Sequence, residues 1–175
     1  MCYECNFKNI AKTIAIFISL ILIITLIILI INQKNENQPD VLVAIARNGD
    51  NTQAGTTTIK FSQNNIVEGT AISHEEGSDE ININETGIYQ VSYQLFGVQN
   101  VSGTFNFNAI LSVNNQALQD TFNESPVIRN STSNRMTLTS TVILELQEGD
   151  VLKLNGVSIE DINYDNARID IEKIG

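Results

Sequence analysis

The sequence has almost no cysteine, which excludes a disulfide framework for most of the chain. Its two cysteines, Cys2 and Cys5, both lie in the opening stretch MCYECNF. A domain without disulfides must be stabilised by its own core or by oligomerisation. The C-x-x-C spacing is not accompanied by further metal ligands or by a βαβ pattern, so it predicts neither a zinc site nor a redox motif. Free thiols and acylated cysteines stay open as alternatives.

The sequence is also poor in the residues that most enzyme sites need. It has one histidine, His74, and it shows no Gly-rich phosphate loop and no recognisable Ser/His/Asp arrangement. Adjacent acids such as Glu75 and Glu76 occur, but glycoside hydrolysis needs two carboxylates that converge across a cleft. There is no Gly-X-Y repeat and no heptad repeat for a stalk. We predict a protein that is not an enzyme and needs no cofactor.

Basic residues are scarce in the larger part of the chain. From residue 41 onward there are seven Lys and Arg residues against seventeen Asp and Glu residues, a net charge of −10. A surface of that sign repels nucleic acid and anionic lipid. The composition therefore excludes a nucleic-acid partner and suits cations, basic partners or plain solubility.

What the sequence does have is one long apolar run. From Thr13 to Ile31 nineteen consecutive residues carry no charge. The only polar members are Thr13, Ser19 and Thr25, whose hydroxyls can bond to the preceding turn of a helix. As a helix the run would span roughly 28 Å, close to the roughly 30 Å hydrocarbon thickness of a bilayer. The run predicts a single transmembrane helix.

A cleaved signal peptide is the alternative reading of this run. Such a peptide has an apolar region of about 7–15 residues and a cleavage site of small residues. Here the run is longer, and NQKNENQPD after it contains no Ala, Gly or Ser, so we predict an uncleaved signal anchor. Lys8 and Lys12 before the run favour a cytoplasmic N-terminus. The predicted type II division is a cytoplasmic tail (1–12), a transmembrane signal anchor (13–31), a linker (32–40) and an extracellular domain (41–175).

The part after Pro39 consists of short strand-like stretches separated by turn residues. They cover 41–47, 56–62, 66–73, 80–84, 85–99, 103–114, 117–122 (a weaker one), 135–147, 151–159 and 167–174. The longest loop is predicted at NESPVIRNSTSN (123–134), and EDINYDN (160–166) predicts another. Nine or ten strands without a helical period predict an all-β sandwich.

Two of the predicted strands alternate cleanly. In one, Tyr89, Val91, Tyr93 and Leu95 share a face, whereas the intervening positions are mostly polar. This pattern is typical of a strand that is buried on one side. In RMTLTSTVILELQ (135–147) one face is mainly Met, Leu and Val, and the other face carries a row of threonines. The threonine row fits either a solvated face or a packed subunit face.

At this point the residues resemble a known family. GIYQVSY (87–93) resembles the G-x-Y-x-F-x-F/Y strand of the complement globular-head (C-one-q) family and its tumour-necrosis-factor relatives, with Val91 in place of the usual aromatic residue. ILELQEGDVLKL (143–154) resembles a later strand, Gly-Asp turn and strand, TTTIKFSQNN (56–65) an early strand and ARIDIEKIG the last one. The sequence is also similar to the head domains of bacterial collagen-like surface and spore-coat glycoproteins. It lacks their collagen region and has Ile81 where the animal family usually has an aromatic residue.

The resemblance implies a ten-stranded jelly roll that forms a homotrimer and works by binding. It also implies that the sheet carrying the Gly-x-Tyr strand helps to bury the centre of the trimer. For Tyr89 and Tyr93 the alternative is the ordinary core of the sandwich. The candidate interface residues are Tyr89, Val91, Tyr93, Thr137, Thr139 and Thr141.

The loop HEEGSDE (74–80) is the one candidate metal site. Hard cations such as calcium take six to eight oxygen ligands, often from one acidic loop. The spacing matches no known calcium loop, and charged clusters are mostly solvated surface. The candidate calcium ligands are His74, Glu75, Glu76, Asp79 and Glu80.

Two functional hypotheses from different classes remain. The first is a membrane-anchored, trimeric, surface-displayed domain for adhesion, receptor contact or envelope architecture, in which three anchored copies gain from multivalency. The second is a jelly-roll carbohydrate-binding module that reads a glycan with the 123–134 loop and with Tyr164 or Phe122.

Overall fold

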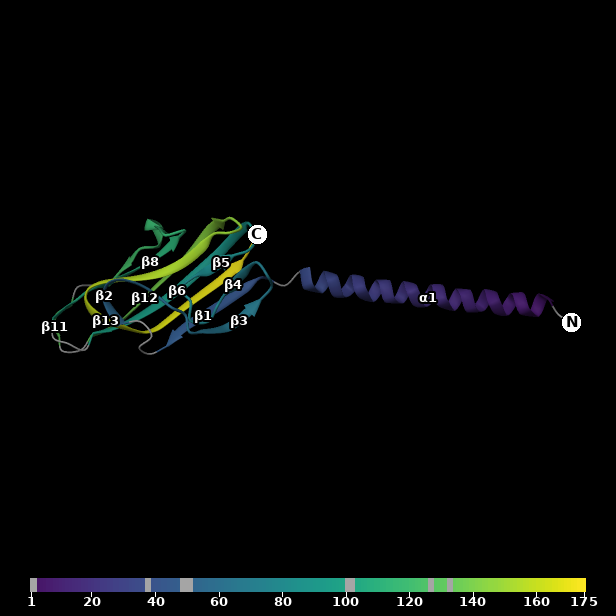
Figure 1. Ribbon diagram of the computed structural model, residues 1–175, viewed down its shortest axis with the longest axis horizontal. Coiled ribbons are helices and arrows are strands. Elements are labelled where there is room, and N and C mark those ends of the chain that lie inside the picture. Colours follow the sequence, from purple (N-terminus) through teal and green to yellow (C-terminus); the bar gives the residue numbers. More distant parts are fainter. Residues whose placement is uncertain (1–2, 37–38, 48–51, 100–102, 126–127, 132–133) are drawn as a thin grey trace. The chain divides into compact units, whose positions relative to one another are not determined.

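The chain divides into two compact units, Met1–Gln38 and Pro39–Gly175. The computed structural model describes residues 3–36, 39–47, 52–99, 103–125, 128–131 and 134–175. Figure 1 shows one helix in the first unit and a layered β structure in the second. The two units are considered separately below.

The first unit contains helix α1, Tyr3–Glu36. Within it, Lys12–Ile30 forms a stretch of 19 residues with a mean hydropathy of 3.2 and no burial, which is long and apolar enough to cross a membrane. Thr25 Oγ1 donates a hydrogen bond of 2.9 Å to the Leu22 carbonyl, as expected for a hydroxyl in an apolar helix. The helix extends beyond the predicted span on both sides because no Pro or Gly precedes Pro39.

The described residues of the second unit form thirteen strands and one short 3₁₀ helix. The strands are β1 (Val41–Arg47), β2 (Thr52–Thr58), β3 (Gln63–Glu68), β4 (Ile72–His74), β5 (Ile81–Ile83), β6 (Gly87–Gln99), β7 (Gly103–Phe105), β8 (Phe107–Val113), β9 (Gln116–Ala117), β10 (Asn123–Glu124), β11 (Ile128–Ser131), β12 (Asn134–Leu146) and β13 (Val151–Lys173). The 3₁₀ helix η1 is Gln119–Thr121. All strand pairs are antiparallel.

The strands form a sandwich of two layers that share strand β13 (Figure 1). The first layer has the order β3–β1–β13–β6–β12 and uses residues 166–172 of β13 next to β1. In the second layer, residues 151–158 of β13 pair with β8 on one side and with β2 and β5 on the other. Strands β9 and β10 pair with β8, and β4 pairs with β5. Strands β7 and β11 form a separate two-stranded ribbon.

The sequence prediction of a loop at 160–166 is wrong. Strand β13 continues through this segment and passes from one layer to the other, with register shifts against β2 and β6 at this point. The Asp and Asn residues gave a turn signal, but Ile162 and Tyr164 alternate and are fully buried. Burial of these two side chains therefore outweighs the local turn preference.

Other strand and loop boundaries also differ from those predicted from the sequence. The predicted strand at 56–62 begins earlier, as β2, and ends at Thr58; Ile59 and Phe61 then lie fully buried beside it. The weak strand at 117–122 is mostly η1, and the predicted loop at 123–134 contains the short strands β10 and β11. Residues 126–127 and 132–133 of that loop lie outside the described residues.

The core lies between the two layers. The inward faces of β1, β6 and β13 meet those of β8 and the first half of β13, and most of these side chains have no exposed surface. Each large apolar side chain buried in this way contributes about 1.5–3 kcal/mol. The fully buried large residues are Leu42, Ile59, Phe61, Ile81, Ile83, Tyr89, Leu95, Phe107, Leu111, Leu152 and Tyr164.

The hydroxyl of Tyr164 is a polar group inside the apolar core. The Tyr164 hydroxyl is buried and, within the described part of the chain, has no hydrogen-bond partner; burial also raises its pKa. Leaving a buried polar group unpaired costs about 1–3 kcal/mol. We expect Tyr164→Phe to raise the free energy of unfolding by about 1 kcal/mol, measured by urea denaturation. Destabilisation would contradict the prediction and would indicate a hydrogen bond to an ordered water.

Candidate functional site

The first half of the candidate calcium loop (74–80) is fixed by hydrogen bonds and a ring contact. His74 Nδ1 lies 2.7 Å from Asn64 Oδ1, and His74 Nε2 lies 3.1 Å from the Ser78 carbonyl oxygen. The Glu76 carboxylate accepts a hydrogen bond of 2.9 Å from the Asn64 backbone N–H. The His74 ring also packs edge-on against Phe61, with the ring centroids 5.9 Å apart. These contacts tie the loop to β3 and to the core.

At the other end of the loop two acids contact a lysine. Lys153 Nζ lies 2.9 Å from Glu80 Oε1 and 3.7 Å from Asp79 Oδ2. The hydrogen bond to Glu80 raises the pKa of Lys153. Among the described residues no group of three or more His, Cys, Asp or Glu could hold a metal ion. Four of the five candidate ligands, all but Glu75, thus contact protein groups, and the calcium site stays a prediction.

The outward face of the first layer carries side chains of β12, β6, β13 and β1. Residues of neighbouring strands form transverse rows on it: Thr141–Ser92–Asp170–Val43, Thr139–Gln94–Arg168–Ile45 and Thr137–Phe96–Asn166. We call these three rows the outer face. Ser92 Oγ and Thr141 Oγ1 are hydrogen-bonded at 2.9 Å. The structure thus brings the three predicted threonines onto one surface, and all three are exposed.

Tyr89, Val91 and Tyr93 point to the opposite side of β6. Their exposed fractions are 0%, 0% and 3%, so they lie in the core between the layers. The Tyr89 hydroxyl donates to the Glu85 carbonyl at 2.5 Å, and the Tyr93 hydroxyl donates to the Thr121 carbonyl at 2.7 Å. Burial raises the pKa of Tyr93 to about 12. The core alternative is the one that their burial supports, and they offer no surface to a second chain.

The outer face contains a hollow of about 710 Å³ at one end. It is lined by side chains of β1, β6, β12 and β13, including Ile45, Gln94, Phe96, Thr137, Asn166 and Arg168. Next to it the Arg168 guanidinium holds the Asp170 carboxylate through Nε and Nη2, at 2.7–3.0 Å. This hydrogen-bonded pairing raises the pKa of Arg168. Among the described residues, the lining of the hollow is thus mainly neutral, with Phe96 as an aromatic wall and Arg168 as a cation.

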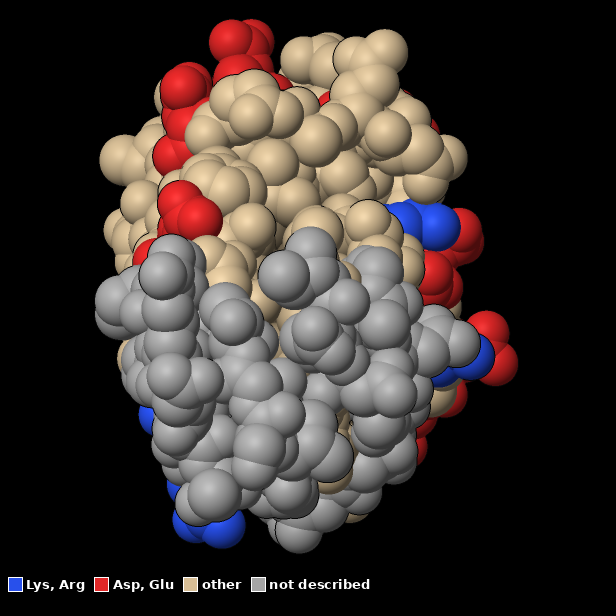
Figure 2. All heavy atoms as spheres, turned by 90° about the vertical axis from the view of Figure 1, so that its left-hand side faces the viewer, with Lys and Arg blue, Asp and Glu red and all other residues tan. Residues whose placement is uncertain are grey.

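Charged side chains are unevenly distributed on the described surface of the face that lies on the left in Figure 1. Figure 2 shows acidic side chains along the margins of this view, with basic side chains directly beside acidic ones on the right. Uncharged side chains fill the described surface between the margins. Cations are thus few, and several have acidic neighbours.

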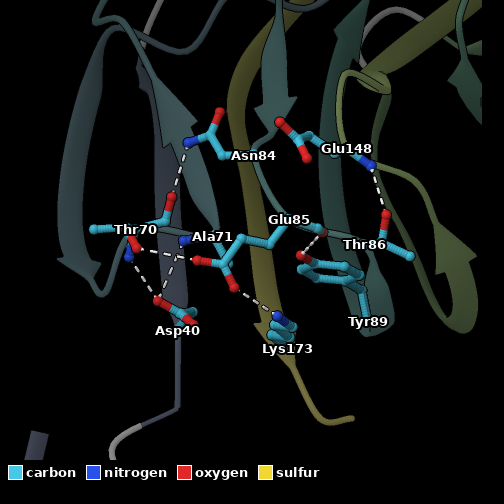
Figure 3. A network of polar contacts seen from close by, with 9 residues as sticks. All are labelled: Asp40, Thr70, Ala71, Asn84, Glu85, Thr86, Tyr89, Glu148 and Lys173. Atoms are coloured by element: carbon cyan, nitrogen blue, oxygen red, sulfur yellow. Dashed lines mark hydrogen bonds and ion pairs between the residues drawn. The ribbon is translucent and has the colours of Figure 1, made fainter. Parts of the chain in front are cut away.

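A second polar cluster lies where the chain enters the β domain (Figure 3). Asp40 Oδ1 accepts hydrogen bonds from the backbone N–H groups of Thr70 and Ala71, at 2.6 and 3.3 Å. Lys173 Nζ lies 2.8 Å from Glu85 Oε2, and the Lys173 N–H donates to the Asp40 carbonyl at 3.0 Å. The cluster joins the first and last strands of the domain to the segment before β6.

The Glu85–Lys173 pair predicts a loss of stability in acid. The hydrogen bond from Lys173 lowers the pKa of Glu85 below its ordinary value of 4.5. The pair therefore stabilises the fold above that value, and this contribution is lost as the pH falls through the lowered pKa of the folded state. We expect Glu85→Gln to flatten the fall of the melting temperature between about pH 5 and pH 3.

The matched control for this prediction is Glu148→Gln, an exposed carboxylate in the same region whose backbone N–H, not its side chain, bonds to Thr86. Thermal melts across the pH series provide the measurement. An equal flattening in both variants would show that the Glu85–Lys173 contact does not stabilise the fold.

The sequence analysis did not identify several residues of the outer face. Gln94 and Phe96 belong to the same strand as Tyr93, and their alternate spacing places them on the opposite face of β6. Arg168 and Asp170 are two residues apart on one strand, a spacing that places both side chains on one face. The sequence contained this signal, but it did not show which strands lie on either side.

The carbohydrate hypothesis loses one of its two aromatic residues. Tyr164 is fully buried and cannot contact a glycan, whereas Phe122 is 46% exposed. The remaining part of the proposed glycan surface, the 123–134 segment, is only partly among the described residues.

No protein-family model and no curated protein sequence matches the chain. Solved structures do match. The crystal structure of murine APRIL at pH 8.0 aligns with a TM-score of 0.55 and 15% identity, covering 78% of this chain and all of the other. The murine APRIL structures at pH 8.5 and pH 5.0 give TM-scores of 0.53 and 0.52, at 17% and 16% identity, with the same coverage.

The β domain is a tumour-necrosis-factor-like jelly roll. The fold agrees with the family resemblance that the strand motifs indicated. At identities of 15–17% the structural match establishes the fold alone. A tumour-necrosis-factor-like domain preceded by one apolar helix fits a type II, single-pass membrane protein.

Proposed function

We propose that the chain is a type II membrane-anchored surface protein whose tumour-necrosis-factor-like domain forms a homotrimer and binds another molecule without catalysis. The apolar helix is the anchor, with the N-terminus in the cytoplasm, and Pro39–Gly175 is the displayed domain. Adhesion, receptor contact and envelope architecture are the roles that such an arrangement serves.

The observation that carries the proposal is the jelly roll behind an apolar helix. The resemblance to the tumour-necrosis-factor superfamily implies the trimer, and the outer face offers a suitable surface. The two rows nearest the hollow, Thr139–Gln94–Arg168–Ile45 and Thr137–Phe96–Asn166, contain no acidic residue. Because residues 41–175 carry a net charge of −10, a surface without acidic residues reduces the repulsion between copies.

The test is the mass of the full chain in detergent and of the separate unit 39–175, by light scattering with detergent correction, with calcium and with a chelator. We expect a trimer in every condition. A monomer in every condition would overturn the trimer, and a trimer that needs calcium would support the predicted ion site in the 74–80 loop. Protease protection of a tag placed before residue 13, in sealed cells, checks the orientation.

A further inference from the structure

The outward face of the second layer is another regular surface of the domain. The core residues of β8 and of the first part of β13 alternate with residues that point away from the core. The strand registers place these outward residues in three transverse rows, which we call the amide face. The rows are Ser112–Lys153, Ile110–Asn155–Thr58 and Glu124–Asn108–Val157–Thr56.

Hydrogen bonds cross the middle of the amide face from strand to strand. Thr58 Oγ1 donates to Asn155 Oδ1 at 3.0 Å, and Asn155 Nδ2 donates to Ser112 Oγ at 3.0 Å. Ser112 is buried and fixes the amide, whereas Thr58 and Asn155 are half-buried and reach the surface. These bonds use the hydroxyl proton of Thr58 and leave lone pairs on Thr58 Oγ1 and Asn155 Oδ1. The middle row therefore presents fixed hydrogen-bond acceptors.

The next row adds an acceptor that lacks a partner. Asn108 Oδ1 is buried and has no hydrogen-bond partner within the described part of the chain. A buried acceptor that stays unpaired is unfavourable. The Asn108 side chain as a whole is only half-buried and belongs to the outward side of β8, so a rotation of its amide turns the oxygen toward a ligand.

The amide face carries little net charge. Lys153 Nζ is paired with Glu80 Oε1 at 2.9 Å, and at the opposite edge Glu124 Oε1 accepts from Asn106 Nδ2 at 3.1 Å. The other members of the three rows are uncharged. Because residues 41–175 carry a net charge of −10, a basic partner would be attracted to other parts of the surface. The molecule that matches this face is neutral and donates several hydrogen bonds.

An aromatic side chain continues the middle row at its edge. Asn123 pairs with Ala109, so Phe122 comes beside Ile110 in the same register. The backbone of Phe122 is extended, with φ = −64° and ψ = 127°. Asn123 Nδ2 donates to the Thr139 carbonyl of the first layer, so the Asn123 side chain points inward. Alternation then directs Phe122 outward, where it is 46% exposed.

We propose that the amide face together with Phe122 binds a neutral oligosaccharide. A sugar ring has an apolar face of C–H groups that packs on an aromatic ring, and its hydroxyls donate to amide and hydroxyl oxygens. The acceptors of the middle row are already fixed by the protein, so little conformational freedom is lost on binding. The site lies within one copy and apart from the outer face. The inference rests on the binding role in the proposed function and names the class of ligand.

Titration of oligosaccharides into the full chain tests the site. The protein is kept in a polyoxyethylene detergent, because a detergent with a sugar headgroup would compete. The probes are cellohexaose, mannohexaose and chitohexaose, and the deacetylated, cationic form of chitohexaose is the charged comparison. We expect at least one neutral probe to bind with a dissociation constant in the micromolar to millimolar range, measured by isothermal titration and saturation-transfer NMR.

Two variants place the bound sugar on the amide face. We expect Asn155→Ala to weaken binding about fivefold, or about 1 kcal/mol at 1.4 kcal/mol per factor of ten. The matched control is Asn65→Ala, an exposed Asn on β3 in the first layer. Circular dichroism and a thermal melt check the fold of each variant.

The second variant removes the aromatic ring and leaves the hydrogen-bonded middle row intact. We expect Phe122→Ala to weaken binding about tenfold, or about 1.4 kcal/mol. Its matched control is Ile66→Ala on β3, because Ile66 is 44% exposed and Phe122 is 46% exposed. The controls should bind as the unchanged chain does.

The outcomes separate this inference from the proposed function. A trimer that binds none of the neutral probes, or that binds them equally well in both variants, overturns the sugar site and leaves the trimer standing. Binding of the cationic probe alone indicates general attraction to an acidic surface and also overturns the site. A monomer whose sugar binding falls in both variants supports the site and overturns the trimer.

Discussion

Gly156→Ala is expected to destabilise the β domain by about 1–3 kcal/mol or more, the range for overpacking a close-packed core. A Cβ atom at position 156 would lie 2.5 Å from Tyr164 Cζ and 2.7 Å from the Tyr164 hydroxyl oxygen. The Tyr164 ring has no room to withdraw, because it is fully buried and packs edge-on against Phe107 with centroids 6.0 Å apart. The measurement is urea denaturation of the unit 39–175.

The steric cause can be separated from a backbone cause. Gly77→Ala is the matched control: nothing lies within 4 Å of its Cβ position, and its cost comes only from φ = +87°. We expect that cost to be about 1 kcal/mol. Adding Tyr164→Leu to Gly156→Ala should give a smaller loss than the sum of the two single losses, by about 1 kcal/mol. Strict additivity would show that the two positions do not collide.

The double variant Thr139→Glu/Thr141→Glu is expected to convert the proposed trimer to monomer at micromolar concentrations. Both side chains are exposed on the outer face, so the fold of one copy should not change. Six added carboxylates at the centre of a trimer would be desolvated near one another, and like charges brought together at an interface cost several kcal/mol. Light scattering and analytical ultracentrifugation measure the change.

The matched control is Thr56→Glu, an exposed threonine on β2 in the second layer. It adds the same group in the same type of structure on another surface, and we expect it to leave the trimer intact. A trimer that survives the double substitution would show that assembly uses a surface other than the outer face. Loss of the trimer in the control as well would indicate a general charge effect.

The sequence was a good guide wherever a local pattern carries the information. The uncharged run predicted a helix able to span a membrane, because length and apolarity alone decide that property. Alternation in β6 and β12 predicted which side chains share a face, because successive residues of a strand point to opposite sides. The strand motifs around Gly87 and the Gly-Asp turn carried the resemblance to the jelly roll that the structure shows.

The sequence was a poor guide wherever contacts with residues distant in the chain decide the local structure. The segment 160–166 has the composition of a turn, yet it is strand because Ile162 and Tyr164 fill the core at the crossing between the layers. In the acidic loop, His74 and Glu80 have Asn64 and Lys153 as partners, which the composition of the loop did not show. Both partners come from other strands, and no local window contains them.

By itself, then, the sequence determined the apolar helix, the β class and the two faces of each long strand. The tertiary structure alone decided which strands are neighbours, and with that it set Phe96 and Arg168 around one hollow and fixed Phe122 at an edge. The physical reason is that side-chain direction follows from the backbone of one strand, whereas a surface depends on the register between strands distant in the chain.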